Sequence, residues 1–358
     1  MNFWQKIKKK KSNEPIICLA PMADVTDRAF RQIIAKYGKP DVLWTEFVSA
    51  DGLFSGGKEA LINDLSFTKK ERPIVAQFFT SKPDMMKKAS ELSAELGFDG
   101  IDINMGCPDK SIEKQGAGAA LIKNPELAKE IILSAKEGAG DLPVSVKTRI
   151  GWSRDELEEW LPKLLEAEPA LITIHARTRK ELSLVPARWQ HVKRAVEIRN
   201  EWRDKNGNKS STLIFGNGDV VDISDAFQKA EECGCDGVML GRAIFGNPWL
   251  FANLSELKNQ NFQRVDLGLD KGRPFGNFDR EISTEQKLKV LVEHTKLFEK
   301  LVQPKPPVGC GKSFAVMKKH FKAYVSGFYG AKELRIKLMD AKDAKEVGLI
   351  ISDYIKMA

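Results

Sequence analysis

The feature that most constrains the fold is a repeated alternation of strand-like and helix-like segments between Ile16 and Leu240. Short apolar runs, each followed by a longer stretch with helical periodicity, occur eight times. The strand candidates are residues 16–20, 41–46, 73–78, 99–103, 143–148, 170–175, 212–215 and 236–240. The first of them is not followed by the GxGxxG turn of an open dinucleotide-binding sheet. The alternation therefore predicts a closed (β/α)8 TIM barrel.

The chain is longer than one such barrel requires. Its 358 residues, 42% of them hydrophobic, can bury one large core and leave roughly 100 residues over. Residues 266–279 are rich in Gly, Asp, Asn and Arg, whereas the apolar residues of 312–328 repeat with helical spacing. We therefore expect four parts: a basic N-terminal tail at 1–13, the barrel at 14–252, a linker at 253–282 and a smaller all-helical domain at 283–358.

Positive charge is concentrated near both ends of the chain, although the net charge is only +8. Residues 1–13 hold five lysines and no acid, and residues 301–339 hold eight basic residues against Glu333 alone. Lys318, Lys319 and Lys322 lie off the apolar stripe of the C-terminal helical pattern, which predicts a basic face suited to a polyanion. Lysines that only keep a helical surface hydrated are the alternative interpretation.

Several classes of protein are disfavoured. The chain has no apolar run of transmembrane length, and its lysine-rich start lacks the apolar stretch of a secretion signal. The five cysteines are odd in number and scattered, which is typical of a reducing compartment. Cys233 and Cys235 have no second Cys or His pair nearby, so we interpret them as packing residues and expect no metal site. We expect a monomeric, cytoplasmic protein that binds no membrane.

Polar residues follow nearly every predicted strand, at the end where α/β barrels carry their chemistry. Cys107 is the most distinctive, because Gly106 and Pro108 flank it and place it on a loop after the fourth strand. A buried structural thiol is the alternative interpretation of a lone cysteine. The other residues at strand ends are Met22, Glu46, Gln77, Asn104, Lys147, Arg149, His175, Arg177, Asn217, Asp219, Gly241 and Arg242.

The last two units of the barrel suggest a phosphate site. The segments 215–219 (FGNGD) and 240–242 (LGR) place glycines where backbone N–H groups can reach an anion, and Arg242 can add a bidentate charge partner. Glycines that only form tight turns are the alternative. Gln77, Lys147 and His175 are suited to hold a polar ring system, and flavin mononucleotide (FMN) combines such a ring with a phosphate.

Seven motifs together resemble the bacterial-type tRNA-dihydrouridine synthase family. They are APMADVTDRAFR at 20–31, DINMGCP at 102–108, GAGAAL at 116–121, VKTRIGW at 146–152, HARTR at 175–179, GNGD at 216–219 and VMLGRAIFGNPW at 238–249. The resemblance spans the whole predicted barrel. It implies FMN in the barrel mouth, NADPH as electron source, and reduction of the C5–C6 double bond of selected tRNA uridines to 5,6-dihydrouridine.

The resemblance also implies roles for individual residues. Cys107 would donate the proton to C5 of uracil, opposite the hydride that FMN delivers to C6. Lys147 would in addition stabilise the negative charge of the reduced flavin ring. The residues implied to line the flavin are Pro21, Met22 and Ala23, those to hydrogen-bond its ring are Gln77, Lys147 and His175, and those to hold its phosphate are Asn217, Gly218, Asp219, Gly241 and Arg242. Those expected to contact tRNA are Arg177, Lys318, Lys319, Lys322 and Arg335.

Two segments depart from the pattern expected of the family and of the barrel. Residues 181–189 lack the tyrosine, glycine and aspartate that family members often carry there, although Trp189 is retained. Residues 200–211 are long and polar for a helix-to-strand connection, so we expect them to protrude from the amino-terminal face.

Two other functions stay open. The alternatives are an FMN barrel oxidoreductase acting on a free pyrimidine or a small enone, and a tRNA-binding protein that does not catalyse. Which tRNA uridines would be modified is not determined.

Overall fold

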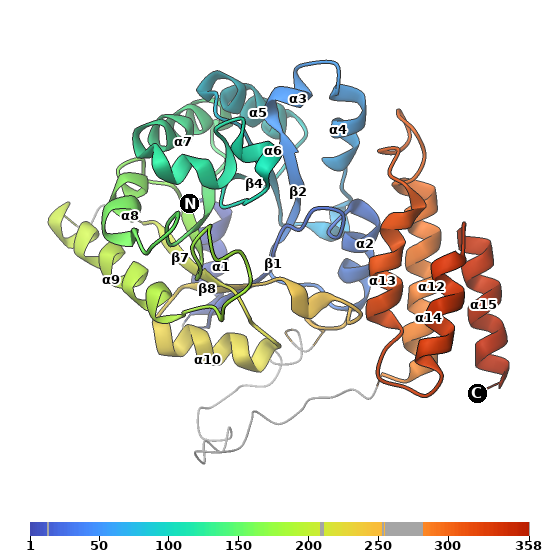
Figure 1. The fold of residues 1–358 in the computed structure, drawn as a ribbon. Helices are drawn as coiled ribbons and strands as arrows, with labels where there is room; N and C mark the ends of the chain where they lie inside the picture. Colours follow the sequence, from blue (N-terminus) through green and yellow to red (C-terminus); the bar gives the residue numbers. More distant parts are fainter. Residues whose placement is uncertain (13, 208–210, 253, 255–281, 358) are drawn as a thin grey trace, which may run out of the picture.

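The computed structural model describes residues 1–12, 14–207, 211–252, 254 and 282–357. The linker expected at 253–282 therefore lies almost wholly outside the described residues. Eight parallel strands form one sheet in the order β1-β8-β7-β6-β5-β4-β3-β2. A parallel bridge between Cys18 and Val42 joins β1 to the start of β2, so the sheet closes. The predicted barrel is confirmed (Figure 1).

Each predicted strand overlaps an observed one. The strands are β1 (Ile16–Leu19), β2 (Leu43–Ser49), β3 (Ile74–Phe79), β4 (Gly100–Met105), β5 (Val144–Arg149), β6 (Leu171–His175), β7 (Leu213–Asn217) and β8 (Gly237–Leu240). They are buried almost throughout. Strands covered on both faces appear in a sequence as continuous apolar runs, which is the reason that these runs identified them.

Helices cover the outside of the barrel. They are α2 (Arg28–Tyr37), α3 (Ala50–Leu53), α4 (Lys58–Asp64), α5 (Pro83–Glu95), α6 (Lys110–Glu113), α7 (Pro125–Ala139), α8 (Leu157–Leu165), α9 (Gln190–Lys205) and α10 (Ile223–Cys233), with 3-10 turns η1 (Lys69–Glu71), η2 (Gly118–Lys123) and η3 (Arg242–Ile244). Their starts follow capping chemistry: the Asp27 carboxylate accepts the N–H groups of Ala29 and Phe30, and prolines open α5 and α7.

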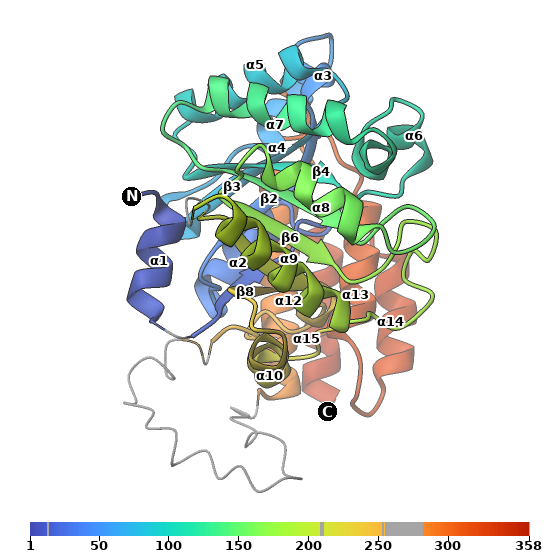
Figure 2. The same ribbon diagram turned by 90° about the vertical axis from the view of Figure 1, so that its left-hand side faces the viewer.

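The segment expected as a basic tail folds differently. Residues Phe3–Lys11 form helix α1, which begins with a capping box at Asn2 and packs at the end of the barrel opposite α6 (Figure 2). Trp4 is buried, with its ring 5.7 Å from that of Trp44 and 5.6 Å from that of Phe215 inside the barrel. The lysines dominate the composition of this segment, but its aromatic residues determine where it packs.

The C-terminal region is all-helical, as predicted, and lies beside α2 (Figure 1). It contains α12 (Thr284–Leu301), the turn η4 (Phe314–Val316), α13 (Met317–Tyr324), α14 (Ala331–Asp340) and α15 (Ala344–Met357). Phe30 of α2 stacks on His294 of α12 at 4.9 Å between ring centroids. Lys36 Nζ and the Tyr37 hydroxyl both donate to the carboxylate of Glu293 at 2.6 Å. This region is therefore packed directly against the barrel.

The polar segment 200–211 is mostly helical. Helix α9 continues to Lys205, so only the residues after it can form the connection to β7, and 208–210 lie outside the described residues. Arg199 anchors this end of α9, because its guanidinium donates to Thr212 O at 2.7 Å and pairs with Asp236 at 3.0 Å. The expectation of a connection at 200–211 was therefore wrong for residues 200–205, which are helical.

Candidate active site at the barrel mouth

Strand register gathers the predicted polar residues at the carboxyl ends of the strands. Asn104 of β4 pairs directly with Lys147 of β5. One level higher, Arg149 pairs with His175 of β6, and His175 pairs with Asn217 of β7. Because parallel strands in register end at one edge, residues far apart in sequence meet at the same mouth.

A hydrogen-bonded chain lies at the base of the mouth. The Gln77 amide donates to Asp102 Oδ2 at 2.6 Å, and the Asn104 amide donates to Gln77 Oε1 at 3.3 Å. The Ser145 hydroxyl donates to the other oxygen of Asp102 at 2.5 Å. Burial raises the pKa of Asp102 to about 6, against the hydrogen bonds from Ser145 and Gln77. Asp102 was not singled out from the sequence, although a carboxyl group inside an apolar strand was a visible signal.

The Cys107 loop is held from both sides. Asn104 Oδ1 accepts the N–H groups of Gly106 at 3.1 Å and Cys107 at 2.9 Å. Ala119 N donates to Cys107 O at 3.0 Å, and Gly118, with φ +61°, leaves room for that carbonyl group, since a Cβ there would lie 2.9 Å from it. Burial raises the pKa of the half-buried Cys107 thiol. Cys107 is therefore a protonated thiol at neutral pH, which suits a proton donor better than a thiolate nucleophile.

Lys147 is half-buried beside this loop. Burial and the charge of Arg149 lower the pKa of Lys147 to about 8, while Asp102 and Cys107 oppose that shift. Within the described part of the chain, its ammonium group forms no hydrogen bond or ion pair. A desolvated ammonium without a partner is suited to bind a negatively charged or strongly polar group.

His175 ends the next strand, β6, and Arg177 follows it by two residues. Burial, and then the charges of Lys147 and the neighbouring arginines, lower the pKa of His175 well below its usual value, so the imidazole is neutral. The Arg177 side chain is only 3% exposed, pairs with Asp219 and donates to Val185 O at 2.6 Å. Arg177 therefore supports the site from inside, whereas the sequence had suggested a contact with RNA.

The loops after β7 and β8, which were predicted to form a phosphate cradle, lie next to each other. The Asn217 amide donates to Met239 O at 2.8 Å, which joins the ends of β7 and β8. Gly218 has φ +124°, a conformation that glycine adopts most readily. A Cβ at Gly241 would meet no atom closer than 3.8 Å, the nearest being Ala20 Cβ and Met22 Sδ. The loop after β8 thus leaves open space next to Gly241, beside the Met22 side chain of the loop after β1.

The acidic side chain in this cradle orients arginines. Asp219 pairs with Arg177 through one oxygen and with Arg242 through the other, the latter at 2.5 Å. Although burial opposes it, the hydrogen bond from Arg177 and the charges of Arg177 and Arg242 lower the pKa of Asp219 below its usual value. The Arg242 side chain is 63% exposed. Arg242 and the backbone N–H groups, rather than the Asp219 carboxylate, can therefore meet a phosphate.

The altered loop at 181–189 is ordered by its own contacts. Glu181 accepts two bonds from the Arg188 guanidinium, at 2.6 and 3.0 Å, and Leu182 O accepts one from Arg149 at 3.0 Å. Trp189 donates its indole N–H to Gly218 O at 2.8 Å. The retained tryptophan thus supports the loop after β7.

The residues expected to contact RNA divide into two groups. Lys318, Lys319 and Lys322 are exposed on α13, and Arg335 of α14 is half-buried and donates to Val325 O at 3.4 Å. Lys312, which also contributed to the basic segment, is largely buried against carboxylates of the barrel. Within the described residues, no group of His, Cys, Asp and Glu side chains is arranged to hold a metal ion. None of the described helices is both long and apolar enough to cross a membrane.

A closed barrel with a thiol, a desolvated lysine, a neutral histidine and a glycine cradle at its carboxyl end has the arrangement of a TIM-barrel enzyme. The family model described as dihydrouridine synthase (Dus) matches residues 18–357. The chain therefore belongs to the dihydrouridine synthase family and is an enzyme of that family, as its motifs predicted.

Similar proteins cover nearly the whole chain. A Bacillus subtilis (strain 168) protein named probable tRNA-dihydrouridine synthase 2 is 36% identical over 355 residues, which is 99% of this chain and 96% of that protein. A Staphylococcus aureus (strain COL) protein named probable tRNA-dihydrouridine synthase is 35% identical over 355 residues, covering 99% of this chain and 95% of its own.

Two solved structures share the fold. A 2-naphthoyl-CoA reductase in complex with 2-naphthoyl-CoA has a TM-score of 0.51 at 11% identity, covering 67% of this chain and 50% of its own. A histamine dehydrogenase from Rhizobium sp. 4-9 has a TM-score of 0.51 at 14% identity, covering 68% of this chain and 46% of its own. At such identities the likeness concerns the barrel fold alone.

Proposed function

We propose that this chain reduces specific uridines of tRNA to 5,6-dihydrouridine, with FMN bound at the barrel mouth and NADPH as the electron source. The observation that carries the proposal is the placement of the half-buried Cys107, on the loop after β4, next to strand β5 with the half-buried Lys147, whose ammonium has no hydrogen-bond or ion-pair partner among the described residues. Family membership supports the reaction, and the names of the similar bacterial proteins support tRNA as the substrate.

The residues at the mouth fit an FMN molecule. Gly241 has open space beside its backbone and lies next to the exposed Arg242, as a phosphate requires, whereas the buried Gly218 gives the loop after β7 its shape. The neutral His175 offers a hydrogen bond, and Lys147 offers a charge, to a polar ring system. Gln77 is fully buried and bonded to Asp102 and Asn104, so it would support the floor of the ring site. Pro21, Met22 and Ala23 would line the ring from the loop after β1, and Asn217 with Asp219 would hold the phosphate loop in shape.

When bound, the flavin supplies a hydride to C6 of the uracil ring. Cys107 then gives its proton to C5, whose basicity rises as negative charge develops there. Lys147, with its pKa lowered to about 8, is mostly protonated at neutral pH, and partial burial strengthens its attraction for an anionic ring. Asn104 fixes the direction from which Cys107 approaches, because it holds two N–H groups of that loop.

A uridine within folded RNA has to leave its stack to reach a barrel mouth. The flanking backbone then needs positive charge, which Lys318, Lys319 and Lys322 of α13 would provide. Arg335 of α14 would add to it, since its guanidinium reaches Val325 O just after α13. A tRNA substrate is consistent with a cytoplasmic location, and a monomer would be sufficient, since the barrel and the basic helix belong to one chain.

The proposal is tested by nucleoside mass spectrometry on unmodified tRNA incubated with FMN, NADPH and the protein. We expect dihydrouridine with the wild-type chain and a large loss of product with Cys107→Ala. Replacement of NADPH by NADH in a parallel reaction tests the electron donor. Equal product from the Cys107→Ala protein would contradict the role of the thiol.

The same assay separates the alternative functions. Reduction of free uridine without tRNA would favour an FMN oxidoreductase that acts on small molecules. A protein that binds FMN and tRNA but forms no product would favour a binding role.

A further inference from the structure

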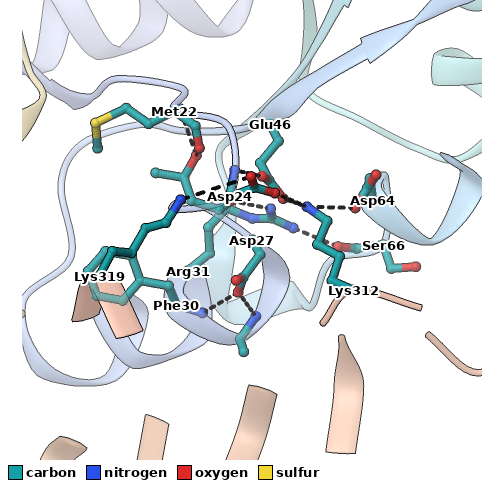
Figure 3. Close-up of polar contacts among 12 residues, drawn as sticks. Met22, Asp24, Asp27, Phe30, Arg31, Glu46, Asp64, Ser66, Lys312 and Lys319 are labelled. Carbon is teal, nitrogen blue, oxygen red and sulfur yellow. Dashed lines mark hydrogen bonds and ion pairs between the residues drawn. The ribbon is translucent and has the colours of Figure 1, made fainter. Parts of the chain in front are cut away.

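Lys312 connects the C-terminal region to the inside of the barrel. It lies between α12 and α13, but its side chain is only 18% exposed. Its ammonium is 2.8 Å from Glu46 Oε2, 3.5 Å from Asp64 Oδ1 and 3.7 Å from Asp24 Oδ1 (Figure 3). These carboxylates belong to β2, to the end of α4 and to the loop after β1. One cation thus joins three separate elements of the barrel.

Glu46 links Lys312 to the loop after β1. Its side chain is 6% exposed, and its Oε1 atom accepts the N–H group of Asp24 at 2.5 Å. Burial raises the pKa of Glu46 to about 7, whereas the charge of Lys312 lowers it. The ionised form of Glu46, which is the stronger acceptor for Asp24, therefore depends on Lys312.

The turn that Glu46 holds is conformationally disfavoured. Asp24 has φ +53°, in the left-handed region that residues with a Cβ rarely adopt. The preceding Met22 carbonyl accepts the N–H groups of Val25 at 3.1 Å and Thr26 at 3.0 Å. The Thr26 hydroxyl also accepts the Met22 N–H group at 3.0 Å and donates to Met22 O at 3.2 Å, so Glu46 of β2 adds to these local bonds the one that holds the Asp24 amide. Asp24 directly follows the three residues proposed to line the flavin.

A second lysine approaches the same turn from helix α13. Lys319 Nζ lies 3.9 Å from Asp24 Oδ2, so the helix with the exposed lysines begins beside this turn (Figure 3). Lys319 is half-exposed, whereas Lys312 is mostly withdrawn from water. A charge is screened less when it is withdrawn from solvent, so Lys312 attracts the carboxylates more strongly than Lys319 does.

We propose that Lys312 is a positioning residue that, through Glu46, keeps the Pro21–Asp24 turn in the conformation that lines the flavin. The C-terminal helical region thereby contributes to cofactor binding as well as to RNA binding. This inference rests on the proposed flavin site, but its effect on the turn itself can be measured without flavin.

The first test is hydrogen–deuterium exchange on the flavin-free protein. Lys312→Met should accelerate exchange of peptides covering residues 20–27 by about tenfold, because a weakened Glu46 acceptor lets the Asp24 amide open. Lys305→Met is the matched control: it removes the same charge from an exposed position in the same segment. Exchange of residues 20–27 should be unchanged in that control.

The second test is titration with FMN, followed by flavin fluorescence. Lys312→Met should raise the FMN dissociation constant by about tenfold, a typical effect of losing a residue that orients a ligand-binding group. The double variant Lys312→Met/Glu46→Gln should recover most of the affinity. Glutamine keeps a carbonyl oxygen for the Asp24 N–H group but cannot carry the unpaired negative charge.

The outcomes separate this inference from the proposed function. If the wild-type protein bound no FMN, the flavin site would be wrong, and exchange at 20–27 would still decide the role of Lys312 in the turn. If the wild-type protein bound FMN and Lys312→Met changed neither exchange nor affinity, the inference would be overturned.

Should Lys312→Met fail to fold, Glu46→Ala replaces it, because it removes the acceptor of the Asp24 amide directly. Faster exchange at 20–27 together with weaker FMN binding would support the inference. Unchanged values in both measurements would overturn it.

Discussion

At the scale of single residues, burial sets the protonation state of the groups proposed to act. The Cys107 thiol is half-buried, and burial raises its pKa by more than the positive charges of Arg149 and Lys147 lower it. Lys147 loses hydration as well, yet with a pKa of about 8 it keeps its proton at neutral pH. The barrel mouth thus holds a neutral acid, Cys107, and a cation, Lys147. Lys147 lies two residues below the strand position that pairs with the neutral His175.

Cys107→Ala should slow the oxidation of reduced flavin by tRNA by about 10²–10⁴-fold, the usual contribution of a general acid. Reduction of the flavin by NADPH should be unchanged, because the thiol supplies a proton to uracil only. Stopped-flow absorbance resolves the two half-reactions. An equal loss in both would indicate a structural defect and contradict the assignment.

A second residue-scale feature lies between the barrel and the C-terminal region. His294 and His320 are fully buried, with ring centroids 4.6 Å apart, and within the described residues their nitrogens have no hydrogen-bond partner. Burial lowers the pKa of His320 to about 3 and that of His294 well below its usual value. Both rings are therefore neutral in the folded state.

The two histidines should lower stability as the pH falls from about 6.5, where histidines of the unfolded chain begin to bind protons that the folded chain does not bind. The raised pKa values of Asp102 and Glu46 act in the opposite direction over the same range, so the histidine effect is measured as a difference between variants. Each histidine contributes a slope of up to ~1.4 kcal/mol per pH unit between the unfolded and folded pKa values. Chemical denaturation between pH 7.5 and 4.5 measures it. His320→Phe should remove the share of one histidine, so that its stability relative to the wild type rises as the pH is lowered. A difference that does not change with pH would argue against the buried neutral state.

At the scale of elements, the loops after β4 and β6 are tied together. Arg179 makes a two-pronged ion pair with Glu113 of α6, six residues beyond Cys107 in the chain. The Trp152 ring lies 4.0 Å from Lys123 Nζ and 4.8 Å from the Arg179 guanidinium. These contacts connect the segment that carries the proposed acid to the altered loop after β6.

Arg179→Ala should loosen the Cys107 loop with little change in global stability, because a partly exposed ion pair contributes only about 0–1 kcal/mol. We expect faster hydrogen exchange in residues 106–117 and a turnover reduced by about tenfold, since a misplaced acid transfers its proton less efficiently. Arg154→Ala, at a 74% exposed position near Trp152, is the matched control. Unchanged exchange in the Arg179 variant would refute the link.

At the scale of the whole molecule, the C-terminal helices are fixed to the barrel. Buried rings of α2, α12 and α13 form the contact, and Lys319 of α13 reaches Asp24 beside the mouth. The exposed lysines of α13 therefore have a fixed position relative to the proposed active site, as binding of a large, folded polyanion would require.

Charge reversal at Lys318 and Lys322 should weaken tRNA binding and reduce its dependence on salt, because each lost phosphate contact lowers the slope of log K against log salt by roughly 0.7–0.9. Filter binding at several salt concentrations measures both quantities. Lys88→Glu, exposed on α5, is the control. FMN affinity should stay constant throughout. Equal affinities of the wild-type and reversed proteins would exclude α13 as the RNA contact.

Much of the fold could be predicted because its signals are local. A buried parallel strand is a short apolar run, and the glycine and proline around Cys107 mark a loop wherever they occur. Helix α1 escaped prediction because its lysines dominate its composition, while the contacts of Trp4 with Trp44 and Phe215 join distant segments. Asp102 could have been noticed, since a carboxyl group in an apolar strand is rare.

The sequence by itself determined the barrel, the polar residues at its strand ends and the family to which the chain belongs. Only the tertiary structure decided that Arg177 is buried, that Lys312 is a largely buried cation among barrel carboxylates, and that burial raises the pKa of Cys107. The reason is physical. Periodicity and turn chemistry depend on neighbouring residues, whereas burial, charge partners and pKa values depend on groups that only folding brings together.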